Sequence, residues 1–302
     1  MSRGGEPSPD MRREPSGLSN RLPRLLRSPG ALFGVPVVLL VVTAALFAQY
    51  VSPHDPFQQD LNLRLQPPFW EEGGELSRPL GTDQFGRCLF SRIILGGRAS
   101  IIVGVSAVLL SALIGIPVGL VAGYSRGRVD EVIMAIADVQ YSFPFLFLAL
   151  VLSYLLGPSL HNTVLALGFA GWVTYARVTR GEVLSIRERD YILAARAIGC
   201  SATRTVVRHV LPQVVTPLIV VGTLQTAWMI VVEASLSYLG MGVQPPTPSW
   251  GNILAEGRLH MLNSWWYATF PGIAITITVL GLNMMGDWLR DVLDPRSRLR
   301  SQ

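Results

Sequence analysis

The feature that most constrains this chain is a series of apolar stretches, each long enough to cross a lipid bilayer. A membrane-spanning helix needs about 20 mostly apolar residues, because the bilayer core offers exposed backbone groups no hydrogen-bond partner. About six such helices are predicted, near Ala31–Val51, Ala99–Tyr124, Glu131–Leu156, Asn162–Ala176, Leu211–Ser235 and Tyr267–Leu289. Only 15% of the residues are charged, against about 25% in ordinary globular proteins. We therefore expect an all-α, polytopic membrane protein.

The placement of arginine predicts which side of the membrane each connection occupies. The tail before the first span, the segments 126–128 and 177–208, and the chain from residue 290 hold 19 of the 25 arginines. Short connections rich in arginine stay on the cytoplasmic side. This predicts that both termini are cytoplasmic.

These patterns divide the chain into consecutive parts. The predicted organisation is a disordered cytoplasmic tail (1–30), a first transmembrane helix (31–51), an outer loop (52–98), a transmembrane core (99–289) that includes a cytoplasmic loop (187–211), and a second cytoplasmic tail (290–302). The first tail is rich in Arg, Pro, Gly and Ser and has too few apolar residues to fold alone.

The composition also excludes some functions. The net charge of +5 depends on arginine alone, because the sequence contains no lysine. A phosphate-binding P-loop requires a lysine that reaches the β- and γ-phosphates, so any ATP must bind another subunit. The four histidines and two cysteines show no metal-ligand spacing. We therefore predict no catalytic, cofactor-binding or metal-binding residues, and no enzyme activity.

The loop over 187–211 is the most informative connection. Its apolar residues recur at helical spacing and predict one face of a short helix: Tyr191, Ala194, Ala195 and Ile198. Gly199 suits the left-handed position that ends a helix, and Ser201 can cap a second short helix. Pro212 then suits the first turn of the fifth span. The segment thus predicts a helix–turn–helix on the cytoplasmic side.

Two interpretations of this helix–turn–helix remain open from its pattern. An amphipathic segment can rest on lipid headgroups. However, the small side chains of Ala194, Ala195 and Ala197 bury little area in lipid, and they favour close approach by another protein.

The same stretch resembles the EAA motif of ABC importer permeases, E-A-A-x-x-x-G-x9-I-x-L-P. The matching residues are Leu193, Ala194, Ala195, Gly199, Leu211 and Pro212. Leu193 stands where that family often has glutamate, and His209 stands at its isoleucine. The resemblance implies that the loop docks on a partner ATPase and transmits its movement to the spans. The coupling residues that it implies are Tyr191, Ala194, Ala195, Arg196 and Gly199.

Two further stretches are similar to one branch of that family. Residues 80–100 and 235–258 resemble segments of dipeptide and oligopeptide permeases, and their order matches the C-type subunit. The resemblance implies a channel-forming permease subunit of the cytoplasmic membrane that imports di- or oligopeptides. The same branch also contains transporters of nickel and other small solutes, so that alternative stays open.

The resemblance also implies a set of partners. They are a homologous second permease, two ATPases that bind the ATP and Mg, an extracytoplasmic solute-binding protein, the peptide substrate and membrane lipid, with no nucleic acid. A rival hypothesis is a secondary transporter or channel that works without ATPases. Such proteins often contain internal repeats or broken, charged half-helices, and the sequence shows neither.

Polar and ionisable groups inside a membrane are costly and normally face a cavity or a partner. Asp138, Gln225 and Glu233 are therefore predicted to line the translocation pathway, although polar contacts between helices are an open alternative for each. Gln225 and Glu233 are eight residues apart and share a helix face. Asp138 can instead pair with an arginine such as Arg177, whereas Glu233 is assigned to the pathway or its outer gate.

Overall fold

The computed structural model describes residues 28–125 and 127–293. Their regular elements are helical, apart from one isolated bridge between Thr82 and Cys88. The elements are η2 (Gly30–Gly34), α2 (Val35–Leu46), α3 (Ala48–Val51), η3 (Leu61–Leu63), α4 (Leu89–Ser125), α5 (Arg128–Tyr141), α6 (Phe145–Leu156), α7 (Leu160–Ile186), α8 (Asp190–Ala197), α9 (Ala202–Thr205), η4 (Val206–Val210), α10 (Leu211–Tyr238), α11 (Trp250–Arg258) and α12 (Trp266–Leu293). The predicted all-α fold is confirmed. The predicted disordered tail over 1–30 lies largely outside the described residues, as does most of the tail from residue 290.

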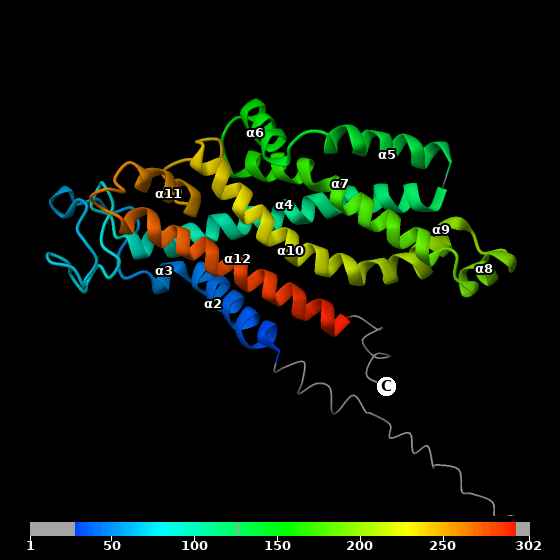
Figure 1. Ribbon diagram of the computed structural model, residues 1–302, viewed down its shortest axis with the longest axis horizontal. Helices are drawn as coiled ribbons and strands as arrows, with labels where there is room; N and C mark the ends of the chain where they lie inside the picture. Colours follow the sequence, from blue (N-terminus) through cyan, green and yellow to red (C-terminus); the bar gives the residue numbers. More distant parts are fainter. Residues whose placement is uncertain (1–27, 126, 294–302) are drawn as a thin grey trace, which may run out of the picture.

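The long helices α4, α7, α10 and α12 run lengthwise through the molecule (Figure 1). The segment 52–88 and α11 gather at one end, which we call the loop end. The short helices α8 and α9 lie at the opposite end, which we call the α8 end. The described chain begins and finishes close together, since a Cβ on Gly30 would lie 2.6 Å from the Cβ of Trp288.

Within residues 28–125 and 127–293, three helices are long and apolar enough to cross a membrane, or up to four if α5 and α6 form one bent span. They are Leu89–Ser125, Ala202–Tyr238 and Trp266–Leu293, and a shorter apolar helix covers Gly30–Leu46. α7 is also long, but His161, Asn162, Arg177 and Arg180 make it more polar than these. The count of six spans therefore stays a prediction.

Several predicted boundaries are wrong. α4 begins at Leu89 rather than Ala99, so the predicted loop over 52–98 is shorter, and α12 continues to Leu293, past the predicted start of the tail at 290. α7 likewise extends to Ile186. The first turns of α4 contain Arg92, which the apolar pattern excluded, but ion pairs within the protein allow this side chain to be buried.

The predicted third span, Glu131–Leu156, is not one continuous helix. α5 and α6 meet at an angle of 88°, and the break lies at Ser142–Pro144. Pro144 has a ψ of 129°, and its ring disfavours a helical conformation for the preceding Phe143. The proline therefore divides this apolar stretch into two differently directed helices.

Glycines allow α4 and α7 to approach closely. Gly115, Gly119 and Gly123 recur every four residues on α4 and share one face. A Cβ on Gly119 would lie 2.4 Å from the carbonyl oxygen of Ala176 and 2.7 Å from the Cβ of Thr179. Small residues at this spacing let membrane helices pack backbone to backbone.

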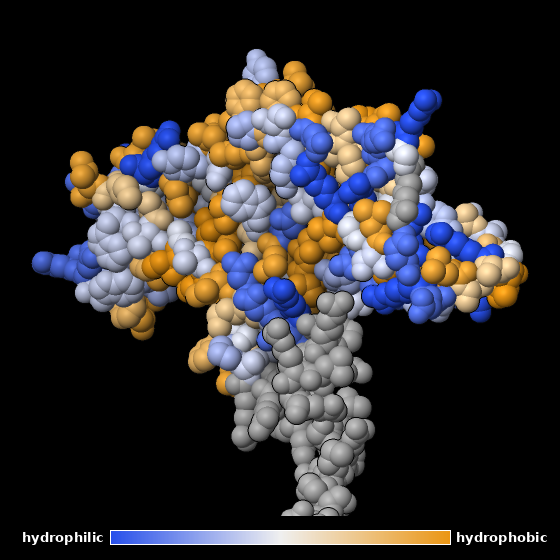
Figure 2. Space-filling model, turned by 45° about the vertical axis from the view of Figure 1, so that its right-hand side comes forward, coloured by the Kyte–Doolittle hydropathy of each residue, from blue (hydrophilic) through white to orange (hydrophobic). Residues whose placement is uncertain are grey.

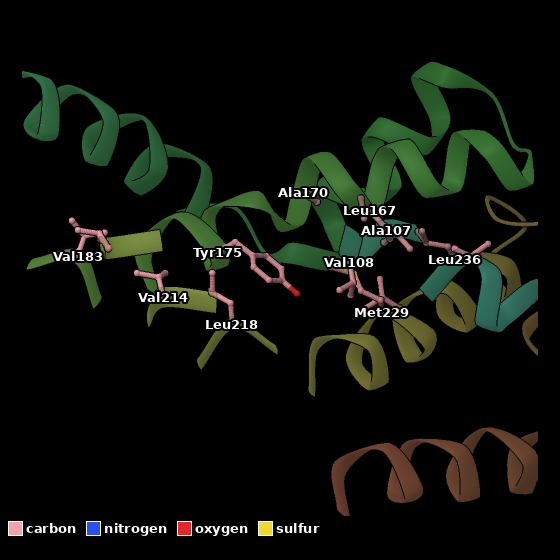
Figure 3. Packing of buried hydrophobic residues seen from close by; sticks show 14 of the residues in the cluster. Ala107, Val108, Leu167, Ala170, Tyr175, Val183, Val214, Leu218, Met229 and Leu236 are labelled. Carbon is pink, nitrogen blue, oxygen red and sulfur yellow. The ribbon is translucent and has the colours of Figure 1, made fainter. Parts of the chain in front are cut away.

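A hydrophobic core joins α4, α7 and α10. Figure 3 shows side chains of these three helices pointing toward one another around Tyr175. The outside is also apolar, and Figure 2 shows hydrophobic residues over much of the face between the two ends. Leu113 on α4 and Leu155 on α6 are 71% and 72% exposed. Apolar surface of this extent indicates contact with lipid or another membrane protein.

Candidate functional site

α8 and α9 form a tight helix–turn–helix at the α8 end. The N–H of Cys200 donates to the carbonyl of Ala195, and the N–H of Gly199 donates to that of Arg196, each at 3.0 Å. Gly199 has a φ of +88°. These two bonds around a left-handed glycine define the Schellman motif that ends a helix. The hydroxyl of Ser201 then accepts the N–H of Arg204 at 3.4 Å and caps α9.

The second short helix does not end before the fifth span. Helical structure continues from Ala202 to Tyr238, through a π-helical turn over Val206–Val210. α10 begins at Leu211 with Pro212 in its first turn, as predicted, but it follows η4 without a break. Pro212 lacks a backbone N–H, so one helical hydrogen bond cannot form. The wider π-helical turn before it accommodates this missing bond. A movement of α9 would consequently act directly on α10.

The predicted apolar face of α8 points away from the rest of the chain. Tyr191 and Ala194 are exposed, Ala195 is half-buried, and Ile198 is 83% exposed. Ile192 is fully buried and packs into the core between the long helices. Ile192 thus provides the buried apolar contact between α8 and the bundle, while the face around Ala194 remains exposed.

Polar contacts fasten this segment to two long helices. Arg187 donates to the carbonyls of Gly123 and Tyr124, at 3.0 and 3.1 Å. It thereby provides hydrogen-bond donors to carbonyls in the last turn of α4, which lack partners within the helix. The guanidinium of Arg196 lies 4.8 Å above the ring of Tyr124. On α10, the side-chain amide of Gln213 accepts from Arg189 at 2.8 Å and bonds the Tyr191 hydroxyl.

The part of α8 that faces away from the bundle is mostly apolar. The exposed α8 face consists of small and apolar side chains, and the Schellman motif closes the C-terminal end of the helix. Among the described residues, no three His, Cys, Asp or Glu side chains gather to hold a metal ion. Such a face could bind the surface of another protein. A displacement of α8 would then reach α4 and α10 through the contacts described above.

The structure places Asp138 in an ion pair with Arg177, the partner that the sequence suggested. The side chain of Asp138 is 67% exposed, and the Arg177 guanidinium lies 4.3 Å above the ring of Tyr141. Asp138 therefore links α5 to α7 on the surface of the bundle.

Glu233 is fully buried near the loop end. It accepts hydrogen bonds from Ser100 on α4 at 2.8 Å and from Ser237 at 2.7 Å. These contacts support the interhelical alternative, since Glu233 could line a pathway only if α4 and α10 separated. Gln225 is half-buried on α10. The three predicted pathway residues therefore have different surroundings and do not form one site.

The sequence interpretation missed a cluster of charges at the loop end. Arg92 donates to Asp83 at 2.6 Å and to Glu256 at 2.8 Å, and Arg87 donates to Asp83 at 2.5 Å. Tyr267 also donates to Glu256 at 2.5 Å. The cluster joins the segment before α4 to α11 and α12. The available signal was the close spacing of Asp83, Arg87 and Arg92, but their distant acid, Glu256, was not apparent.

Glu256 lies in α11, and its environment predicts a pH dependence. Burial would raise the pKa of Glu256, but hydrogen bonds and charge from Arg92 outweigh burial and hold that pKa below its ordinary value. The stabilisation is therefore complete above the unfolded pKa, about 4.3, and is lost as the pH falls through the lower folded pKa.

Replacing Glu256 by glutamine should lower the free energy of unfolding by about 1–3 kcal/mol at pH 7, because Arg92 loses a charged acceptor in a buried place. Thermal unfolding in detergent measures this effect, and the difference from wild type should shrink below about pH 4. Glu75→Gln is the matched control, because Glu75 is exposed and its ion pair with Arg78 is long, at 4.0 Å. Exposed ion pairs of this kind contribute little to stability. Equal effects of both substitutions would contradict the clamping role of the cluster.

Comparisons with known proteins identify transport relatives. The chain is 43% identical over 282 residues to the "Di/tripeptide transport system permease protein DppC" of Pseudomonas aeruginosa (strain UCBPP-PA14), covering 93% of each chain. It is 44% identical to the "Dipeptide transport system permease protein DppC" of Escherichia coli (strain K12), covering 89% of this chain and 90% of the relative. A "Probable D,D-dipeptide transport system permease protein DdpC" of the same strain is 37% identical over 89% of each chain.

The fold is similar to that of a chain in the structure "Inward facing conformations of the MetNI methionine ABC transporter", with a TM-score of 0.58 and 18% identity over 68% of this chain and 98% of that chain. Residues 21–68 match the "N-terminal TM domain of oligopeptide transport permease C". Residues 115–299 match the "Binding-protein-dependent transport system inner membrane component". This integral membrane protein therefore belongs to the family of binding-protein-dependent transport permeases, and its N-terminal part matches the domain of the C-type permease.

Proposed function

We propose that this chain is a channel-forming subunit of an ATP-driven importer of di- or oligopeptides in the cytoplasmic membrane. Relatives that cover about nine-tenths of the chain are named for di- and tripeptide transport. The single structural observation that carries the proposal is the exposed, capped α8, which is fixed to α4 and α10. A transport subunit that receives force from another protein needs such a rigid docking element.

Two partner ATPases would bind ATP and Mg, and one of them would dock on α8 through Tyr191, Ala194, Ala195, Arg196 and Gly199. The displacement would reach α10 through the continuous helix from Ala202, and α4 through Arg187. Packed helices respond to such a displacement by discrete shifts. In this proposal the α8 end is cytoplasmic, which also places both termini inside the cell.

The other end of the molecule would face outward. A solute-binding protein would deliver peptide to the loop end, where the buried charge cluster holds α11 in place. A homologous second permease would cover part of the apolar face and complete the channel, with lipid covering the rest. This chain would conduct the peptide without any catalytic step.

Uptake of radiolabelled Ala-Ala tests the substrate. Cells that lack this gene should take up the dipeptide at least tenfold more slowly than the parent, and the intact gene should restore the rate. A parallel assay with labelled nickel should show equal uptake in both strains. Nickel uptake that depends on the gene, with unchanged dipeptide uptake, would overturn the peptide assignment.

A further inference from the structure

A groove at the loop end lies apart from both the α8 region and the charge cluster. It has a volume of about 760 Å³ and lies between the chain after α2, the loop-end part of α4, and the turn before α11. Small-molecule sites in proteins usually measure about 300–1,000 Å³. The groove is therefore large enough for a dipeptide or tripeptide.

Arg98 provides one wall of the groove with a free positive charge. Its side chain is exposed on α4, and no carboxylate in residues 28–125 or 127–293 pairs with it. Arg92, two turns earlier on the same helix, is by contrast enclosed by Asp83 and Glu256. Unpaired charges on a spanning helix normally face a cavity or a ligand. Arg98 thus has an environment suited to an anion from outside the chain.

The chain after α3 provides the groove with a carboxylate and also contains two buried polar atoms without partners. Asp55 is exposed, and its carboxylate accepts only the backbone N–H of Phe57, at 2.9 Å. The hydroxyl of Ser52 and the Nδ1 of His54 are buried, and neither finds a hydrogen-bond partner within the described part of the chain. Buried polar atoms without partners are uncommon in folded proteins. Both belong to residues that line this groove.

We infer that this groove binds the two charged ends of an unblocked small peptide. Arg98 would hold the terminal carboxylate by charge-assisted hydrogen bonds, and Asp55 would hold the terminal ammonium. Peptides of different sequence share only their backbone and their two termini. A permease that accepts varied side chains can therefore retain a peptide through these two charges. The inference rests on the proposed function, and it names the subsite.

Photolabelling of the assembled, full-length transporter in washed membranes tests the site. The probe is L-alanyl-photoleucine, whose label is located by mass spectrometry. We expect label on the lining segments 48–57 and 95–102. Unlabelled Ala-Ala should compete about tenfold better than Ala-Ala-amide or N-acetyl-Ala-Ala, since each blocked peptide lacks one charged end.

Two substitutions assign the charges to residues. Arg98→Gln should abolish the advantage of Ala-Ala over its amide, and should leave its advantage over the acetylated peptide. Asp55→Asn should abolish the advantage of Ala-Ala over the acetylated peptide, and should leave its advantage over the amide. Arg128→Gln is the control, because Arg128 is an exposed arginine at the start of α5, outside the groove. In the Arg128→Gln variant, the three peptides should compete for labelling as they do in the wild type.

Three results would overturn the inference. Blocked and unblocked peptides could compete equally, both substitutions could leave the pattern unchanged, or a photoreactive phosphatidylethanolamine could label the groove where the dipeptide does not. If cells take up Ala-Ala normally while the groove stays unlabelled, the subsite fails and the proposed function stands. If gene-dependent uptake of Ala-Ala is absent, the proposed function fails as well.

Discussion

Replacing Gly199 by valine should reduce ATP-dependent transport at least tenfold while the protein still inserts into the membrane. Gly199 has a φ of +88°, and a left-handed backbone costs an L-residue about 1–2 kcal/mol, with β-branched side chains among the least tolerant. A Cβ at this position would meet no atom within 4 Å. The effect would therefore come from the backbone alone, through loss of the Schellman motif that ends α8.

Asparagine at the same position provides the matched control. It is larger than alanine but adopts the left-handed conformation more readily than most residues. Gly199→Asn should therefore retain most of the transport. The measurement is dipeptide uptake, normalised to the amount of assembled protein in the membrane. Equal uptake by the valine variant and the wild type would contradict a docking role for this turn.

Replacing Gly119 by alanine should destabilise the folded protein by about 1–3 kcal/mol, the usual cost of overpacking. The new Cβ would lie 2.4 Å from the carbonyl oxygen of Ala176 and 3.0 Å from its Cα. These are backbone atoms, so α4 and α7 would have to separate. Because the two helices form much of the core, we expect a lower midpoint of thermal unfolding in detergent.

Gly181→Ala is the corresponding control on α7. Gly181 is exposed, and a Cβ there would have no neighbour within 4 Å. Alanine is favoured over glycine inside a helix by about 0.5–1 kcal/mol, so this variant should be at least as stable as the wild type. A similar loss of stability in both variants would indicate general helix effects and would contradict close packing at Gly119.

The sequence predicted the helical class and much of the α8 region because these depend on local patterns. Gly199, Ser201 and the spacing around Ala194 determine a turn and its caps within a few residues. The same local reasoning missed the start of α4, since Arg92 appears incompatible with a buried helix until Asp83 and Glu256 are placed beside it. Such pairing across distant segments has no periodic signal.

Two other differences have a similar origin. The apolar run over 131–156 satisfies the length of a span, but the direction of its halves depends on one proline and on packing against α7. Glu233 shares a helix face with Gln225, and that face alone suggested a pathway. Only the neighbouring helix, with Ser100 2.8 Å away, shows that the carboxylate is enclosed.

The central claim is that this chain conducts peptide and receives its energy from separate ATPases. Proteoliposomes that contain the complete transporter, with binding protein and labelled Ala-Ala on the outer side, test it most directly. We predict accumulation of the dipeptide above its external concentration only when ATP and Mg are supplied on the side of α8, and no accumulation with Gly199→Val. Accumulation without ATP, or full accumulation by the Gly199→Val variant, would contradict the account.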